Sequence, residues 1–270
     1  MVKQYYYLIA SLPELRLDDY KEPYRVWEFK AELFENLVPQ HYQYIKDMLF
    51  GYDIANMADV LLDIDDPWTR QKGRWEFTQL REKLNTKDCE FADYITNVVA
   101  EARDKKKSNI PLSRQEVEDE LFSGFYRMMI THKNFFIREY FKFGLDLRNI
   151  LAALNKRKFG LERVKFIDIE KDEVVYNLQT SNAADFGLSR KFIFMPELID
   201  IFAKEELVEM EKYIDHLRWQ KIDEINIFSY FDVDVLLGYL LKLMLVERWI
   251  NLDTHKGREV FEQITKVEVL

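Results

Sequence analysis

Residues 135–160 read FFIREYFKFGLDLRNILAALNKRKFG. Apolar side chains recur here at almost every helical turn, a pattern typical of a helix that is buried on most sides. The basic run at 156–158 places positive charge where the helix dipole is negative, and Gly160 is the residue type that most often ends a helix. The segment therefore predicts a long central helix around which the rest of the chain packs.

The central helix also carries one half of an internal repeat. DLRNI at 146–150, followed by Leu154, matches DIANM at 53–57, followed by Leu61, at a constant offset of 93 residues. Residues three apart share one helix face. Each copy thus presents a carboxylate beside an amide: Asp53 with Asn56, and Asp146 with Asn149. A third copy near Asp232 has Val235 in place of the asparagine. We infer one domain built from about three helical units: 1–105, 106–195 and 196–270.

Most of the remaining chain also has helical periodicity, and its 8 glycines and 6 prolines are too few to interrupt many helices. Helices are expected at 26–37, 42–62, 75–98 with a polar break near 85–88, 113–158 with a junction near 132–134, 196–217 and 230–250. Ser113 is a candidate N-cap for its helix. The charged run 103–109 is expected to be a solvated connector. Residues 164–178 permit a small β-hairpin. The predicted class is all-α.

Composition limits the classes of function. With 39 Lys and Arg against 48 Asp and Glu, the net charge is −9, which disfavours general binding to nucleic acids or anionic membranes and favours protein partners. Cys89 is the single cysteine, so no intrachain disulfide is expected. The apolar run 5–12 is too short for a signal peptide, and four charged residues interrupt 233–250. A cytoplasmic protein without a membrane span is expected.

No catalytic motif is complete in this sequence. DFG at 185–187 resembles a kinase magnesium motif, but no Gly-rich phosphate loop or HRD segment accompanies it. The four histidines, at 41, 132, 216 and 255, have no paired spacing on one helix face. We expect no metal, cofactor or nucleotide. Four aspartates leave one enzymatic alternative open, a metal-dependent hydrolase that uses Asp63, Asp65, Asp66 or Asp185.

Two polar stripes on otherwise apolar helices are candidate partner-binding surfaces. Asp234, Gly238 and Lys242 are spaced by four, and either face water or receive a partner helix close to the backbone at Gly238. The central helix carries a second stripe, which includes the repeat residues: Glu139, Lys142, Asp146 and Asn149. Glu247 and Arg248 are expected to form an ion pair with a neighbouring helix.

Five segments resemble a bacterial family whose genes accompany V-type ATP synthase operons, and the likeness runs nearly end to end. These segments are YYYLIASLPEL at 5–15, DFGL at 185–188, LRW at 217–219, YLLKL at 239–243 and ERW at 247–249. That family is similar to the C-type stalk protein of archaeal and bacterial rotary ATPases, which corresponds to the d-type protein of eukaryotes. DLRNI at 146–150 and RKFG at 157–160 carry this second likeness best. The chain departs from the C-type stalk protein at 242–245, where KLML stands in place of a Lys-Glu-x-Glu pattern.

The resemblance implies an all-helical funnel of three similar units. It further implies a noncatalytic central-stalk component of a proton- or sodium-translocating ATPase, whose partners are the rotor-shaft subunits and the membrane rotor ring. Such a protein would contact the inner face of the cell membrane only through those partners. A helical adaptor unrelated to the rotor is the remaining alternative.

Overall fold

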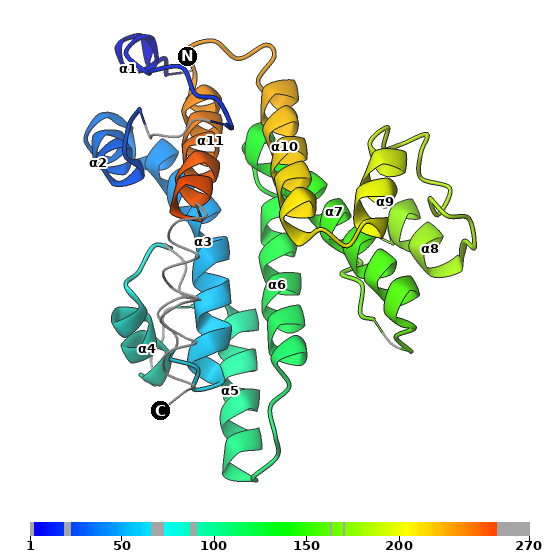
Figure 1. Ribbon diagram of the computed structural model, residues 1–270. Helices are drawn as coiled ribbons and strands as arrows, with labels where there is room; N and C mark the ends of the chain where they lie inside the picture. Colours follow the sequence, from blue (N-terminus) through cyan, green and yellow to red (C-terminus); the bar gives the residue numbers. More distant parts are fainter. Residues whose placement is uncertain are drawn as a thin grey trace, which may run out of the picture. The chain divides into compact units, whose positions relative to one another are not determined.

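The computed structural model describes residues 3–18, 23–65, 73–86, 91–162, 164–169 and 171–252. Over these residues the chain forms eleven helices and no strand, which confirms the predicted all-α class (Figure 1). The helices are α1 (Tyr6–Ala10), α2 (Val26–Asn36), α3 (Pro39–Leu61), α4 (Phe77–Asn85), α5 (Asp93–Lys107), α6 (Arg114–Ile130), α7 (Phe135–Phe159), α8 (Glu173–Thr180), α9 (Met195–Ala203), α10 (Leu207–Ile225) and α11 (Val233–Asn251). Asp66, Cys89 and His255 lie outside the described residues.

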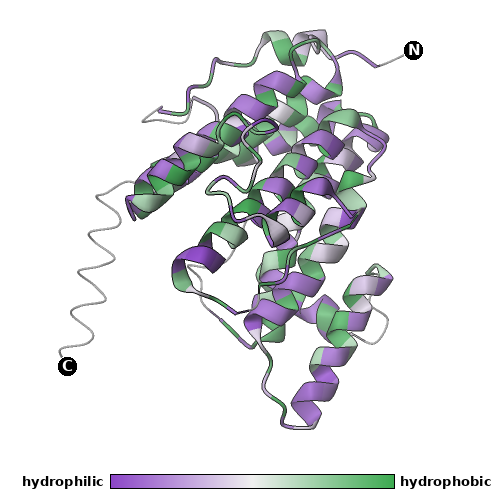
Figure 2. Cartoon of the chain, turned by 90° about the vertical axis from the view of Figure 1, so that its right-hand side faces the viewer, coloured by the Kyte–Doolittle hydropathy of each residue, from purple (hydrophilic) through white to green (hydrophobic). Residues whose placement is uncertain are grey.

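The chain divides into two compact units. Unit 1 comprises Met1–Tyr42 and Leu207–Leu270, and unit 2 comprises Gln43–Glu206. Most helices have a hydrophobic side and a hydrophilic side, as expected for helices that bury one face (Figure 2). The three-unit division 1–105, 106–195 and 196–270 stays a prediction.

In unit 1, helix α11 packs against α2 and α10. Its buried leucines, together with Phe29 of α2, form the core of this unit. The Phe29 ring lies edge-on to Tyr239, with 5.0 Å between ring centroids. Among the described residues, no helix combines the length and hydropathy that a membrane span requires.

In unit 2, the predicted central helix is α7, and it packs against α6 and α8. The core centres on Phe125 of α6, whose ring contacts Phe141 of α7 at 5.3 Å between centroids. The backbone of α6 approaches a neighbouring ring closely at Gly124, where an added Cβ would lie 2.1 Å from the Tyr94 ring. A glycine is therefore required at this crossing of α5 and α6.

Several helix ends follow the chemistry of their sequence. The Asn134 side chain accepts a hydrogen bond from the Ile137 N–H and begins α7, while Gly160 ends it in the left-handed conformation, with φ of 59°. The Ser113 hydroxyl caps α6, as predicted, by accepting from the Glu116 N–H. These local signals are sufficient to place both ends of the central helix.

The expected hairpin at 164–178 is wrong. Residues 164–168 have no regular structure, and α8 begins at Glu173. Asp172 caps α8 by accepting from the Val174 N–H at 3.0 Å, and the buried side chains of Val174, Val175 and Leu178 share one helix face. A short β-branched run fits a strand or a buried helix equally well by periodicity, and here the acidic N-cap decides for the helix.

Two expected boundaries also differ from the structure. The run 103–109 is not a connector, because α5 continues to Lys107 and its three terminal lysines lie favourably at the negative end of the helix dipole. The single helix expected at 196–217 is instead two helices, α9 and α10, with a break at 204–206. Glu205 has a positive φ of 63° at this break, which ends α9.

Candidate functional site

The two Asp/Asn pairs of the internal repeat lie inside unit 2. Asp53, Asn56, Asp146 and Asn149 are all buried. Burying polar groups is costly unless they are hydrogen-bonded, so their bonding partners define their role. A buried side chain cannot contact a partner protein directly. These residues could therefore affect binding only through the chain segments to which they are hydrogen-bonded.

Asn149 holds the segment that follows α7. Its side-chain amide donates to the Ile167 carbonyl at 3.0 Å, and its oxygen accepts from the Ile167 N–H at 3.1 Å. The bonded backbone is buried, and the Ile167 side chain packs against Ile130 and Leu145. A single side chain thus satisfies both backbone groups of Ile167 and fixes the irregular segment 164–169 against the helices.

Asp53 bonds the backbone of the loop before α4 in a similar way. Its carboxylate accepts from the Arg74 N–H at 2.9 Å and from the Trp75 N–H at 3.3 Å. The loop approaches so closely at Gly73 that an added Cβ would lie 2.0 Å from the Asp53 carboxylate. In each copy of the repeat, one member of the pair therefore bonds backbone about 20 residues downstream. We call Asp53 and Asn149 the loop anchors.

We predict that Asn149→Ala destabilises the protein by about 2–4 kcal/mol, because it leaves two buried backbone groups of Ile167 without partners at about 1–3 kcal/mol each. Urea unfolding followed by circular dichroism measures the change. Asn97→Ala, at an exposed position of α5, is the matched control and should stay within about 0.5 kcal/mol of the wild type. Equal stability of the two variants would contradict the anchoring role.

The stripe on α11 faces another helix of its own chain. The Lys242 ammonium pairs with Asp223 and lies 4.5 Å from the centre of the Trp219 ring, with only 17% of its side chain exposed. The Asp234 carbonyl accepts from the Asn226 side chain at 3.1 Å, and Gly238 is buried. At Lys242 and at the Asp234 carbonyl, the stripe therefore contacts α10 and the residue that follows it.

A buried carboxylate joins α10 to α11. Asp215 is 0% exposed and accepts from Arg218 at 2.8 Å, Arg248 at 2.6 Å and the Trp249 indole at 3.0 Å. Arg248 also pairs with Glu211, so the expected ion pair from Arg248 to a neighbouring helix is confirmed. The sequence analysis missed Asp215, although an acid within the apolar stripe of α10 is a signal that could have revealed it.

We predict that Asp215→Ala lowers the free energy of unfolding by about 1.5–3 kcal/mol, because Arg218, Arg248 and the Trp249 indole lose the charged acceptor that they share. Asp223→Ala is the control, since its ion pair with Lys242 is largely exposed on the aspartate side and such pairs contribute about 0–1 kcal/mol. Thermal and urea unfolding compare the two variants. A loss for Asp215→Ala no greater than that for Asp223→Ala would show that the buried cluster contributes little.

Tyr239, within the YLLKL segment of α11, has a buried hydroxyl with no hydrogen-bond partner among the described residues. Burial raises the pKa of Tyr239 to about 12. The folded state therefore holds this proton more tightly than the unfolded chain, whose tyrosine pKa is about 10. Its contribution to stability is complete below pH of about 10 and is lost as pH rises through about 12.

We predict that Tyr239→Phe is neutral or stabilising by up to about 1 kcal/mol at neutral pH, because an unsatisfied buried polar group is removed without changing the ring. The variant should also lose less stability than the wild type between neutral and strongly alkaline pH. Urea unfolding at both pH values tests this. Tyr176→Phe, at an exposed position of α8, is the control. Destabilisation at neutral pH would show that the hydroxyl has a partner.

Asp185 lies in a turn before α9. Its carboxylate accepts from the Gly187 N–H at 2.9 Å and the Ser189 N–H at 3.3 Å, and hydrogen bonds from Ser189 and Gly187 lower the pKa of Asp185. Arg157 lies 3.5 Å from the centre of the buried Phe186 ring and donates to three carbonyls of the same loop, those of Ser181, Ala183 and Ala184. These contacts fix the loop 181–189 to the end of α7.

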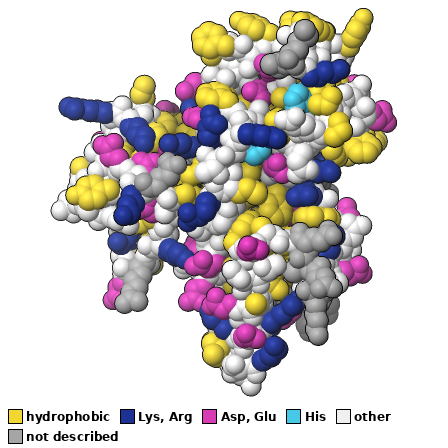
Figure 3. Space-filling model, turned by 180° about the vertical axis from the view of Figure 1, so that it is seen from behind, with side chains coloured by type: hydrophobic (Ala, Val, Ile, Leu, Met, Phe, Trp, Pro, Cys, Tyr) yellow, Lys and Arg dark blue, Asp and Glu magenta, His cyan; other side chains and the backbone are white. Residues whose placement is uncertain are grey.

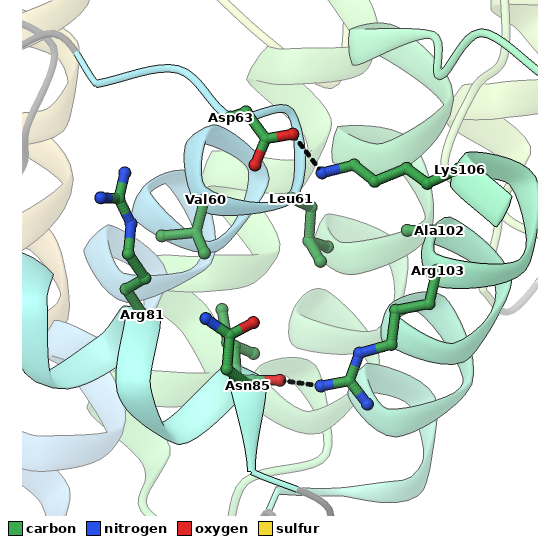
Figure 4. A pocket seen from close by; sticks show the side chains of 9 residues that line it. Val60, Leu61, Asp63, Arg81, Asn85, Ala102, Arg103 and Lys106 are labelled. Atoms are coloured by element: carbon green, nitrogen blue, oxygen red, sulfur yellow. Dashed lines mark hydrogen bonds and ion pairs between the residues drawn. The ribbon is translucent and has the colours of Figure 1, made fainter. Parts of the chain in front are cut away.

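Asp63 borders a pocket of about 180 Å³ in unit 2 (Figure 4). Three basic side chains line it, Arg81, Arg103 and Lys106, above an apolar floor that includes Leu61 and Leu84. Asp63 is mostly exposed and pairs with Lys106, whereas Asp65 pairs with Arg81 at 3.5 Å. Arg103 donates to the Leu84 carbonyl. The pocket thus presents positive charge and hydrogen-bond donors. The carboxylate that lines it, that of Asp63, is paired with Lys106.

The described part of the chain contains no group of three or more His, Cys, Asp or Glu side chains placed to hold a metal ion. Of the aspartates named for a hydrolase, Asp63 lines the pocket, Asp65 pairs with Arg81, and Asp185 lies in the turn before α9. Asp66 is outside the described residues.

Comparison with known proteins gives a family that spans both units. A family model described as "Protein of unknown function (DUF2764)" matches residues 2–268. The chain belongs to this family. An uncharacterized protein of Chlamydia muridarum is 20% identical over 274 residues, covering 97% of each chain. An uncharacterized protein of Chlamydia trachomatis serovar D is 21% identical over 191 residues, covering 69% of each chain. No solved structure matches the chain at a significant level.

The match to the DUF2764 family covers almost the whole chain. The family model spans both compact units and every buried polar cluster described above. Unit 1 is discontinuous in sequence, since its two parts flank the whole of unit 2. The family region is therefore the entire two-unit chain, not one unit of it.

Proposed function

We propose that this protein is a noncatalytic central-stalk component of a V/A-type rotary ATPase or ATP synthase, which links the rotor shaft to the membrane rotor ring. The proposal rests first on the resemblance, nearly end to end, to the family of V-type ATP synthase operons. The repeat DLRNI at 146–150, which carries the likeness to the C-type stalk protein, supplies the second support. In the structure its Asn149, like Asp53 of the other copy, is a buried loop anchor.

The loop anchors are the observation that bears most on this role. A part that passes torque between two partners must deform little under load, because deformation would absorb the rotation. Irregular segments are the softest parts of a helical protein, and here two of them are bonded to helix interiors by buried side chains. Close-packed helical cores around them transmit strain efficiently. This construction suits a passive coupling part that needs no cofactor.

In this role the protein is cytoplasmic and is held at the inner face of the cell membrane by its partners, the shaft subunits and the rotor ring. Its own residues need not perform chemistry. The direction of the motor and the ion that it carries are properties of other subunits.

Affinity purification from native membranes tests the proposal. We expect the tagged full-length protein to copurify with shaft and ring subunits under mild detergent, and to move to the soluble fraction when the ATPase is dissociated. An unrelated soluble protein with the same tag is the control. Recovery of the protein alone, from membranes whose ATPase remains assembled, would contradict the proposal and favour an unrelated helical adaptor.

A second measurement addresses the hydrolase alternative. A divalent ion at 100 times its dissociation constant should stabilise the fold by about 2.7 kcal/mol if Asp63, Asp65, Asp66 or Asp185 bind it. We expect no such shift in thermal unfolding with magnesium, manganese or zinc. Stabilisation that disappears in Asp63→Asn or Asp185→Asn would favour the hydrolase.

A further inference from the structure

The pocket in unit 2 brings basic side chains together near the ends of three helices. Its lining comes from the end of α3 and the residues after it, from the C-terminal half of α4 and from the C-terminal part of α5. Arg81 lies on one side of the pocket, Arg103 and Lys106 lie on the other, and Asn85 lies between them (Figure 4). We call this site the basic pocket.

The floor of the basic pocket is apolar. Leu61, Leu84 and Ala102 line it and are buried. Charges above such a floor are screened less by water than charges on an open surface, so their attraction to an anion is stronger. The volume is about 180 Å³, whereas pockets for drug-sized ligands have about 300–1,000 Å³. The basic pocket therefore fits a small ligand only.

Two bases of the pocket pair with exposed acids. Lys106 pairs with Asp63, and Arg81 pairs with Asp65 at 3.5 Å. The side chains of Asp63 and Asp65 are 80% and 52% exposed, and exposed ion pairs of this kind contribute little to stability. An anion that enters the pocket can therefore bind Arg81 and Lys106 in place of these acids.

The third base, Arg103, is held in position by the protein. Its guanidinium donates to the Leu84 carbonyl near the end of α4. A guanidinium carries five N–H donors in a planar fork, and this bond uses one of them. The same fork matches the oxygens of a phosphate group in a bidentate arrangement. Because Arg103 is oriented before a ligand arrives, the entropy cost of binding is reduced.

The charge of the lining indicates the charge of the ligand. Arg81, Arg103 and Lys106 carry three positive charges and Asp63 carries one negative charge, so the lining has a net charge of +2, while Asp65 lies outside it. A phosphate monoester carries about −1.5 to −2 at neutral pH, whereas a carboxylate carries a single negative charge.

The positive charge of the basic pocket is local. The whole chain has a net charge of −9, and acidic and basic side chains are interspersed on the face drawn in Figure 3. A protein that binds nucleic acid by its phosphates needs a wide basic surface. A small anion suits the basic pocket better than a nucleic acid does.

We propose that the basic pocket binds a small phosphate monoester. Arg81 and Arg103 bind the phosphate oxygens from opposite sides, and Lys106 adds a third cation. The body of the ligand rests on the apolar floor. Bound in this way, the phosphate joins α4 to α5. The inference goes beyond the proposed function and does not rest on it, because it concerns a ligand of unit 2 alone.

Isothermal titration calorimetry on the purified full-length protein, at constant ionic strength, tests this inference. The probes are phenyl phosphate, inorganic phosphate and phenyl sulfate, which has the same ring but a single charge. We expect phenyl phosphate to bind with a dissociation constant of about 1 mM or below. The other two probes should bind at least about fivefold more weakly, since inorganic phosphate lacks the apolar body and phenyl sulfate lacks the second charge.

Arg81→Gln and Lys106→Gln should each weaken the binding of phenyl phosphate about tenfold, because each removes a charge-assisted hydrogen bond. Lys107→Gln is the matched control, since Lys107 follows Lys106 on α5 but is 76% exposed and does not line the pocket. It should bind phenyl phosphate like the wild type. Circular dichroism should show all variants folded.

Asp63→Asn gives a readout that a folding defect cannot imitate. The Asp63 backbone has a positive φ of 56°, which asparagine also adopts readily. The substitution removes the carboxylate that competes with the ligand for Lys106. We expect this variant to bind phenyl phosphate about threefold to tenfold more tightly than the wild type.

Absence of saturable binding of phenyl phosphate would overturn the inference, as would binding that Arg81→Gln and Lys106→Gln leave unchanged. Equally tight binding of phenyl sulfate would also overturn it, because the pocket would then not select a doubly charged group. Calorimetry uses the isolated protein, whereas copurification reports on ATPase subunits in native membranes. If calorimetry behaves as expected but no part of the ATPase copurifies, the phosphate site stands and the rotor assignment falls.

Discussion

The requirement that buried backbone polar groups find partners governs much of this structure. Helices satisfy their own backbone, but the segments between them do not, and the backbone of one such segment is buried at Ile167. Side chains on the helices supply the partners: Asn149 bonds Ile167, Asp53 bonds the partly buried loop at 74–75, and Arg157 bonds three exposed carbonyls beyond α7. Connections that would otherwise be soft are thereby fixed to rigid helices.

This arrangement is consistent with a passive mechanical part. The buried side chains of Asp53, Asn149 and Asp215 all bond to other groups of the protein. Their partners are backbone groups or other side chains of the described residues. Asp215 lies among donors from two helices and Lys242 between a carboxylate and an indole. Such clusters restrict how the helices of unit 1 can repack, and restricted repacking is what a coupling part needs.

The sequence was sufficient for the class of fold and for the C-terminal end of α7, because helical periodicity, a basic last turn and a terminal glycine are local signals. It also located the Asp/Asn repeat. It did not show that Asp53 and Asn149 point inward at loops, since that depends on where the chain returns about 20 residues later. The hairpin at 164–178 failed for the related reason that a short apolar run has no periodicity of its own. Asp215 was missed because two of its three partners, Arg248 and Trp249, lie on another helix.

The cluster at Asp215 has a geometric consequence for unit 1. The carboxylate receives donors from Arg248 and Trp249 on α11 and from Arg218 on its own helix. A helix advances about 1.5 Å per residue and about 5.4 Å per turn, so sliding α11 along α10 by one turn would separate Arg248 and Trp249 from Asp215. These two bonds therefore oppose a lengthwise shift of one helix against the other.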